Sequence, residues 1–79
     1  MAKSQNIVHQ YFKKNYEGLR ILVRVNPIHY SGTEITLSEG QAPAIREMQF
    51  DQDILDDLKA DDFAECSPLE FNLYLSGLA

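Results

Sequence analysis

With 79 residues, the chain is long enough for one hydrophobic core and too short for two, so we expect a single domain spanning residues 1–79. Its content of 44% apolar and 24% charged residues is typical of a globular protein and excludes a mainly disordered chain. The formal net charge of −5 at pH 7 argues against nucleic acid as the partner, because an acidic surface repels phosphate.

The sequence contains no covalent or metal-based device that would stabilise so small a domain. Cys66 is the only cysteine, so an internal disulfide is excluded, and the two histidines do not complete a four-ligand zinc site. Stability must then come from an efficient core or from pairing with a second copy or a partner. We expect no signal peptide, and no apolar run approaches the roughly 20 residues of a membrane span. We therefore expect a cytoplasmic protein without a membrane segment.

The first predicted element is an N-terminal helix that starts after Ser4 and ends at Gly18. Ser4 is a suitable N-cap, and glycine commonly ends a helix. The apolar side chains of this segment recur at spacings of three to five residues, as on one face of a helix. They are Ile7, Val8, Tyr11, Phe12 and Tyr16.

After Gly18 the apolar residues recur at every second position, which predicts a strand from Leu19 to Val25. Its even-numbered positions include two arginines, so the odd-numbered positions form the apolar face. Asn26 and Pro27 interrupt the strand, and residues 28–30 are expected to continue it after a bulge. Because proline donates no backbone hydrogen bond, we place this strand at an edge of the sheet.

Two further strands are predicted to complete an antiparallel meander of three strands. A tight turn at Ser31-Gly32 leads to the second strand, residues 33–37, and another turn at Glu39-Gly40 precedes the third, which runs roughly from Ala44 to Phe50. A helix from Gln52 to about Ala60 follows, with Asp51 as its cap. Its buried stripe is formed by Ile54, Leu55 and Leu58.

The C-terminal segment fits either a strand or a helix. Large apolar residues alternate with polar ones over residues 69–75, as in a strand. A helix is favoured because Ser67, Pro68 and Glu70 form a capping box with proline at the first position, and Gly77 is suited to end the helix. Such a helix is apolar on more than one side, so it must be buried or covered by a partner.

These elements predict an α+β fold with an N-terminal helix, a three-stranded antiparallel meander and two C-terminal helices packed on one sheet face. The other sheet face is expected to be polar and to face solvent. It carries Arg20, Leu22, Arg24, Glu34, Thr36, Glu47 and Gln49.

Charge is divided unevenly along the chain. Residues 1–25 carry five basic residues and one acidic residue, whereas residues 26–79 carry two basic and eleven acidic residues. This asymmetry predicts a basic patch and an acidic docking face, each of which is alternatively a solvated surface. The basic patch is Lys13, Lys14, Arg20 and Arg24, and the acidic docking face is Asp53, Asp56, Asp57 and Asp61.

No catalytic, metal-binding or cofactor-binding motif is present. The acidic segment lacks the alternating ligands and the glycine of a calcium loop. His29 and Tyr30 are adjacent, so in a strand they point to opposite faces and cannot cooperate. Cys66 has only Glu65 beside it, and a carboxylate raises the pKa of a thiol rather than activating it. We expect neither an enzyme nor a cofactor.

The sequence therefore favours a small cytosolic, non-enzymatic protein-interaction module, with a protein partner or a homodimer expected. Two alternatives remain: a nucleic-acid-binding domain that uses the basic N-terminal half, and an acidic regulator that occupies a basic surface of its partner. An exposed apolar patch often marks an interface, and the C-terminal segment supplies one. This candidate partner surface is Leu69, Leu73, Tyr74 and Leu78.

Overall fold

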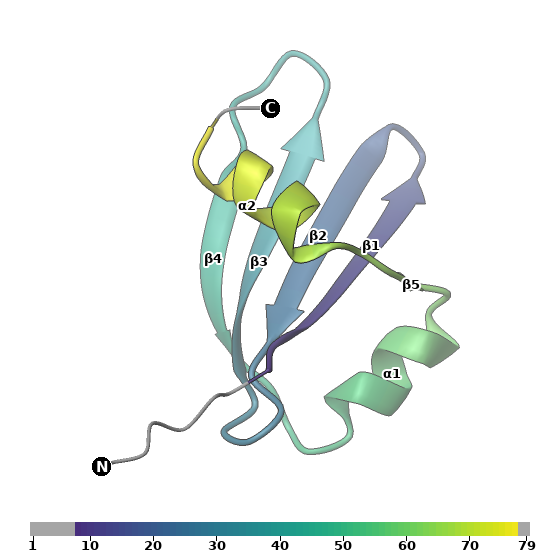
Figure 1. Ribbon diagram of the computed structural model, residues 1–79. Coiled ribbons are helices and arrows are strands. Elements are labelled where there is room, and N and C mark those ends of the chain that lie inside the picture. The colour runs from purple at the N-terminus through teal and green to yellow at the C-terminus, as the bar shows by residue number, and fades with distance from the viewer. Residues whose placement is uncertain (1–7, 78–79) are drawn as a thin grey trace, which may run out of the picture.

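The computed structural model describes residues 8–77, which form one antiparallel sheet and two helices (Figure 1). The sheet has five strands in the order β4-β3-β2-β1-β5, so the first four strands form a meander and the fifth returns to β1. In chain order the elements are β1 (Gln10–Tyr16), β2 (Leu19–Val25), β3 (Ser31–Ser38), β4 (Ala44–Gln49), α1 (Ile54–Ala60), β5 (Ala64–Glu65) and α2 (Pro68–Leu75).

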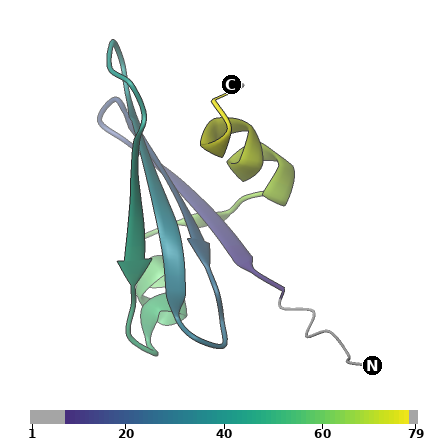
Figure 2. The same cartoon turned by 90° about the vertical axis from the view of Figure 1, so that its left-hand side faces the viewer.

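The two helices pack on opposite faces of the sheet, so the domain has three layers. Leu58 of α1 packs with Phe12, Val23 and Val25, which define the face that we call the α1 face. Phe71 of α2 packs on the other face, the α2 face, against Leu22 and Ile35. In Figure 2, α2 lies clearly to one side of the sheet.

The mixture of strands and helices agrees with a small α+β domain, but the predicted N-terminal helix is wrong. Residues 10–16 form β1, which pairs along its whole length with β2. Tyr11 and Phe12 are adjacent and contact different clusters, one on each face of the sheet. A strand covered on both faces has no apolar alternation, so its pattern resembled a helical stripe. The proposed cap Ser4 and the stripe residue Ile7 lie outside the described residues.

Gly18 ends a strand and not a helix. Glu17 and Gly18 both have positive φ angles, 47° and 84°, and form the two-residue turn between β1 and β2. Such turns match the twist of paired strands and favour glycine at the second central position.

The prediction that residues 19–25 form an edge strand is also wrong. The bounds of β2 agree with the predicted ones, but β2 lies between β1 and β3 and pairs with both. Pro27 belongs to the turn that follows, in which the Asn26 side chain accepts hydrogen bonds from the N–H groups of Ile28 and His29. The proline therefore lies outside the sheet and places no restriction on which strands β2 can pair with.

The predicted arrangement of both helices on one face, with a polar opposite face, is wrong as well. Even-numbered residues of β2 point to the α2 face, where Leu22 is fully buried beneath Phe71. The register of β3 places Glu34 and Thr36 beside Val23 and Ile21, on the α1 face. Sequence alternation separates the two faces of each strand but does not reveal that both are covered.

The two helices differ in how well their ends were predicted. The α2 helix has the expected cap, since the Ser67 side chain accepts a hydrogen bond of 3.1 Å from the Glu70 N–H. The α1 helix begins at Ile54 and has Asp53 at the N-cap position. The predicted cap, Asp51, instead accepts a hydrogen bond from the Asp53 N–H in the turn before the helix.

Candidate interaction surfaces

The predicted basic patch is divided between the two sheet faces, and its cations contact other groups of the same chain. Lys13 lies on the α2 face, where its Nζ is 3.0 Å and 3.3 Å from the two carboxylate oxygens of Glu70 in α2. Lys14 lies on the α1 face and donates a hydrogen bond of 2.6 Å to the Asp61 carbonyl. Its ammonium group also lies 5.6 Å from the Tyr16 ring centroid, a cation–π distance.

The two arginines of β2 are held by the same helix that covers the α2 face. Arg20 donates hydrogen bonds to the Asn15 side chain and to the Tyr74 hydroxyl. Arg24 donates to the Thr33 hydroxyl over 3.2 Å, and its guanidinium group lies 5.3 Å from the Phe71 ring centroid. These two guanidinium groups therefore help to hold α2 on the sheet and form no open cationic patch.

Two titratable groups at the N-terminal end of α2 have shifted pKa values. The hydrogen bond from Lys13 lowers the pKa of Glu70, because it stabilises the carboxylate. Burial raises the pKa of the Cys66 thiol, and the nearby Glu70 carboxylate raises it further. A thiol that is protonated at neutral pH is a weak nucleophile, which is the behaviour expected of a structural cysteine.

The predicted acidic docking face is exposed on α1 and at its ends. Asp53 and Asp61 cap the helix, Asp56 and Asp57 lie in its first turn, and Leu58 faces the core. Spacings of three and four residues bring the carboxylates to neighbouring positions on the helix surface. Among residues 8–77, no group of three or more His, Cys, Asp or Glu side chains is arranged to hold a metal ion.

Only two of the four residues of the predicted partner surface on α2 are exposed apolar side chains in the part of the chain that the structure describes. Leu69 and Leu73 are 70% and 37% exposed, respectively, and lie on the side of the helix away from Phe71. Tyr74 is half-buried, with its ring 5.8 Å from the Arg20 guanidinium group. Leu78 lies outside the described residues. The exposed apolar area on α2 thus comes from two leucines.

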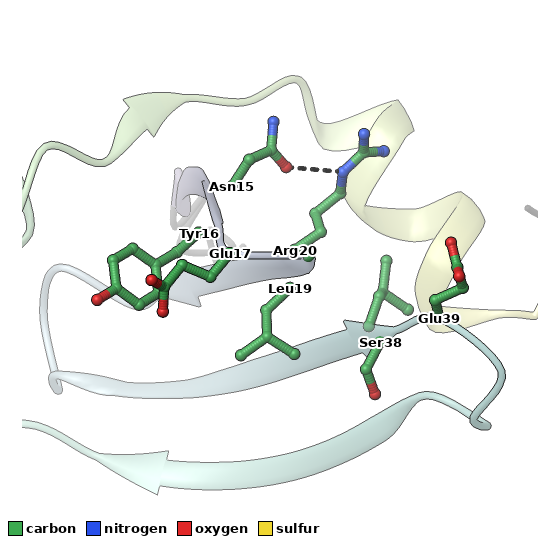
Figure 3. Close-up of a pocket in the computed structure, with 9 residues that line it drawn as sticks. Asn15, Tyr16, Glu17, Leu19, Arg20, Ser38 and Glu39 are labelled. Carbon is green, nitrogen blue, oxygen red and sulfur yellow. Dashed lines mark hydrogen bonds between the residues drawn. The ribbon is translucent and has the colours of Figure 1, made fainter.

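A shallow depression that sequence reasoning missed lies at the end of the sheet, around the turn between β1 and β2 (Figure 3). Its volume is about 560 Å³. Arg20 extends from β2 toward α2 at its border, and Asn15 accepts a hydrogen bond from it (Figure 3). The depression is lined by Asn15, Tyr16, Glu17, Gly18, Leu19, Arg20, Leu37, Ser38 and Glu39.

The sheet edge formed by β4 is a second candidate site that the sequence predictions do not include. The strand pairs with β3 along its six residues and has no neighbour on its other side within the described chain. The Phe50 N–H donates a hydrogen bond of 2.7 Å to the Tyr30 carbonyl, so the backbone of Phe50 points toward β3. In an antiparallel pair, successive residues of a strand point their N–H and C=O groups alternately toward and away from the neighbouring strand. The residues whose N–H and C=O groups then point outward from the sheet are Ile45, Glu47 and Gln49.

Comparison with protein-family models, with curated proteins and with solved structures finds no match. Between residues 8 and 77, neither helix has the length and apolar character that crossing a bilayer requires. Any assignment of function therefore depends on the surfaces described above.

Proposed function

We propose that the protein is a small, non-enzymatic protein-interaction module of the cytosol, and that its partner contributes an extended segment that pairs with β4. The observation that carries this proposal is the open edge of β4. Strand addition to such an edge is a common mode of peptide recognition, in which main-chain hydrogen bonds supply affinity and side chains supply specificity.

The form of this edge supports the proposal. Proteins usually protect edge strands with short length, charged side chains, a proline or a bulge. The β4 strand has six residues in regular register with β3 and contains no proline, and its two charged residues, Arg46 and Glu47, restrict which strands can pair with it. Its outward groups can accept a partner strand without any rearrangement of the sheet.

The test is affinity capture from cells with the wild-type protein and two variants of one edge residue. Glu47→Pro removes an N–H group that points outward, so the pairing of β4 with β3 is retained. Glu47→Ala removes the same carboxylate but keeps the N–H group and is the matched control. We expect proteins that are captured by the wild type and by Glu47→Ala but not by a folded Glu47→Pro. Identical sets from all three proteins would contradict the proposal.

A second candidate function is an acidic regulator that occupies a basic surface of its partner. What favours it is the contrast between the exposed carboxylates of α1 and the cations of β1 and β2, which contact groups of their own chain. Its test is the fourfold substitution of Asp53, Asp56, Asp57 and Asp61 by asparagine. Binding that weakens with salt and is lost in this variant supports this candidate.

A further inference from the structure

The two charged residues of β4 lie next to each other in sequence but on opposite faces of the sheet. Arg46 is on the α1 face, where its Nε lies 3.8 Å from a carboxylate oxygen of its cross-strand neighbour Glu34. Glu47 is on the α2 face, where it accepts a hydrogen bond of 3.3 Å from the hydroxyl of Thr33. An added strand therefore meets one positive side chain of β4 on the α1 face of the sheet and one negative side chain on the α2 face.

Each of these charges has an apolar neighbour on its own face. Ile45 shares the α2 face with Glu47 and is 47% exposed. Met48 shares the α1 face with Arg46 and is half-buried. Side chains directly opposite each other across an antiparallel pair make the closest contacts, so an incoming strand meets all four residues in a fixed order.

The β4 strand of a second copy is a poor occupant of this edge. Antiparallel pairing of β4 with itself must place outward-pointing residues opposite outward-pointing residues. The two registers that use most of the strand then put Glu47 opposite Glu47 or Arg46 opposite Arg46, and like charges directly opposite are destabilising. The charges of β4 thus disfavour pairing of two β4 strands and favour a strand of complementary charge.

We infer that the occupant of the β4 edge is an extended antiparallel segment of another protein with the order apolar, basic, acidic, apolar. This inference rests on the proposed function and adds the chemistry of the partner. The basic residue pairs with Glu47 and the acidic residue with Arg46. The apolar residues at the two ends cover Met48 and Ile45.

The inference is tested with two capped synthetic peptides that differ at one position. Thr-Val-Lys-Glu-Val-Thr has the inferred order, and Thr-Val-Glu-Glu-Val-Thr places an acidic residue opposite Glu47. Titration is followed by the NMR shifts of the amides of β4, which detect weak binding. We expect the wild type to bind the first peptide about threefold to tenfold more tightly than the second, as cross-strand charge pairs predict.

Charge reversal in the protein should reverse this preference. Glu47→Lys is expected to bind the second peptide more tightly than the first. Glu65→Lys is the matched control: it changes the net charge equally, but Glu65 is an exposed residue of β5 at the opposite edge of the sheet. It should keep the preference of the wild type.

The outcomes separate this inference from the proposed function. Shifts at Ile45, Glu47 and Gln49, together with a preference that reverses only in Glu47→Lys, support it. A preference that is absent, or that changes equally in Glu65→Lys, overturns the inferred charge order. Loss of capture by Glu47→Pro in the same study would leave the proposed function standing. An absence of shifts at β4 with both peptides overturns the inference directly.

Discussion

Leu58 and Asp57 are adjacent residues of α1 with opposite environments. Leu58 is buried among Phe12, Val23 and Val25, whereas Asp57 is exposed. We predict that Leu58→Asp unfolds the domain, because burying an unpaired charge costs several kcal/mol, comparable with the whole stability of a small domain. Asp57→Ala should change stability by less than about 0.5 kcal/mol. Thermal melts of both variants test this, and equal losses would show that the wrong side of α1 has been assigned to the core.

Gly32 in β3 is the glycine at which a side chain has no room. A Cβ atom there would overlap the Arg24 carbonyl oxygen and lie 2.6 Å from the Phe50 ring. We predict that Gly32→Ala destabilises the domain by about 2–3 kcal/mol, the cost of overpacking against atoms that cannot move away. Urea unfolding at constant pH is the measurement.

Gly40 is the control for this substitution. Its φ is +78°, but a Cβ atom at this position would have no neighbouring atom within 4 Å, so Gly40→Ala should cost only about 1 kcal/mol from backbone strain. A smaller loss for Gly32→Ala than for Gly40→Ala would contradict the close approach of β2 and β3 at Gly32.

At the scale of elements, we expect the contact between β1 and α2 to weaken at low pH. Lys13 lowers the pKa of Glu70 in the folded protein, so the contribution of Glu70 to stability is fully present above its unfolded pKa, roughly 4.3, and is lost as pH falls through the folded value. We predict a coupling of about 0.2–1 kcal/mol at pH 7 for this partly exposed pair, and almost none near pH 2.

A double-mutant cycle measures this coupling. Lys13→Gln, Glu70→Gln and the double variant are compared with the wild type by urea unfolding at several pH values. Coupling that stays constant down to pH 2, or grows as pH falls, would refute the assigned ion pair.

The elements also differ in how much the sequence revealed about them. The bounds of β2 and both ends of α2 were predicted, because strict alternation and a capping box are local signals. The β1 strand was predicted as a helix, since Tyr11 and Phe12 are apolar on opposite faces and leave no alternation. Whether a strand is covered on one face or two depends on helices far away in sequence, which a local pattern does not contain.

The candidate surfaces show the same limit at the scale of the whole molecule. The uneven distribution of charge along the chain predicts a basic patch. In the structure, Lys13, Arg20 and Arg24 instead contact residues of α2, which lie more than 40 positions further along the chain. One edge is predicted at the wrong strand, because Pro27 is expected at a bulge within that strand, whereas it lies in the turn between β2 and β3. The predicted meander implies an edge at its last strand, residues 44–50, but it does not contain β1, which covers the other side of β2.

This distribution of charge predicts that the protein does not bind nucleic acid. The three cations of the α2 face contact their own chain, and the net charge of −5 repels phosphate. Fluorescence anisotropy with labelled DNA and RNA at about 150 mM salt should show no micromolar binding. Binding at that level, abolished by Arg20→Glu with Arg24→Glu in a folded protein, would instead favour the nucleic-acid alternative.

The central claim is that β4 is an open edge that a partner strand covers. Amide hydrogen exchange, residue by residue, tests it most directly. In the free protein the amides of Ile45, Glu47 and Gln49 should exchange quickly, while those of Arg46 and Met48, which point toward β3, exchange slowly. Addition of a captured partner should slow the first three amides. Outward amides that are already protected in the free protein, or that stay unprotected in the complex, would contradict the claim.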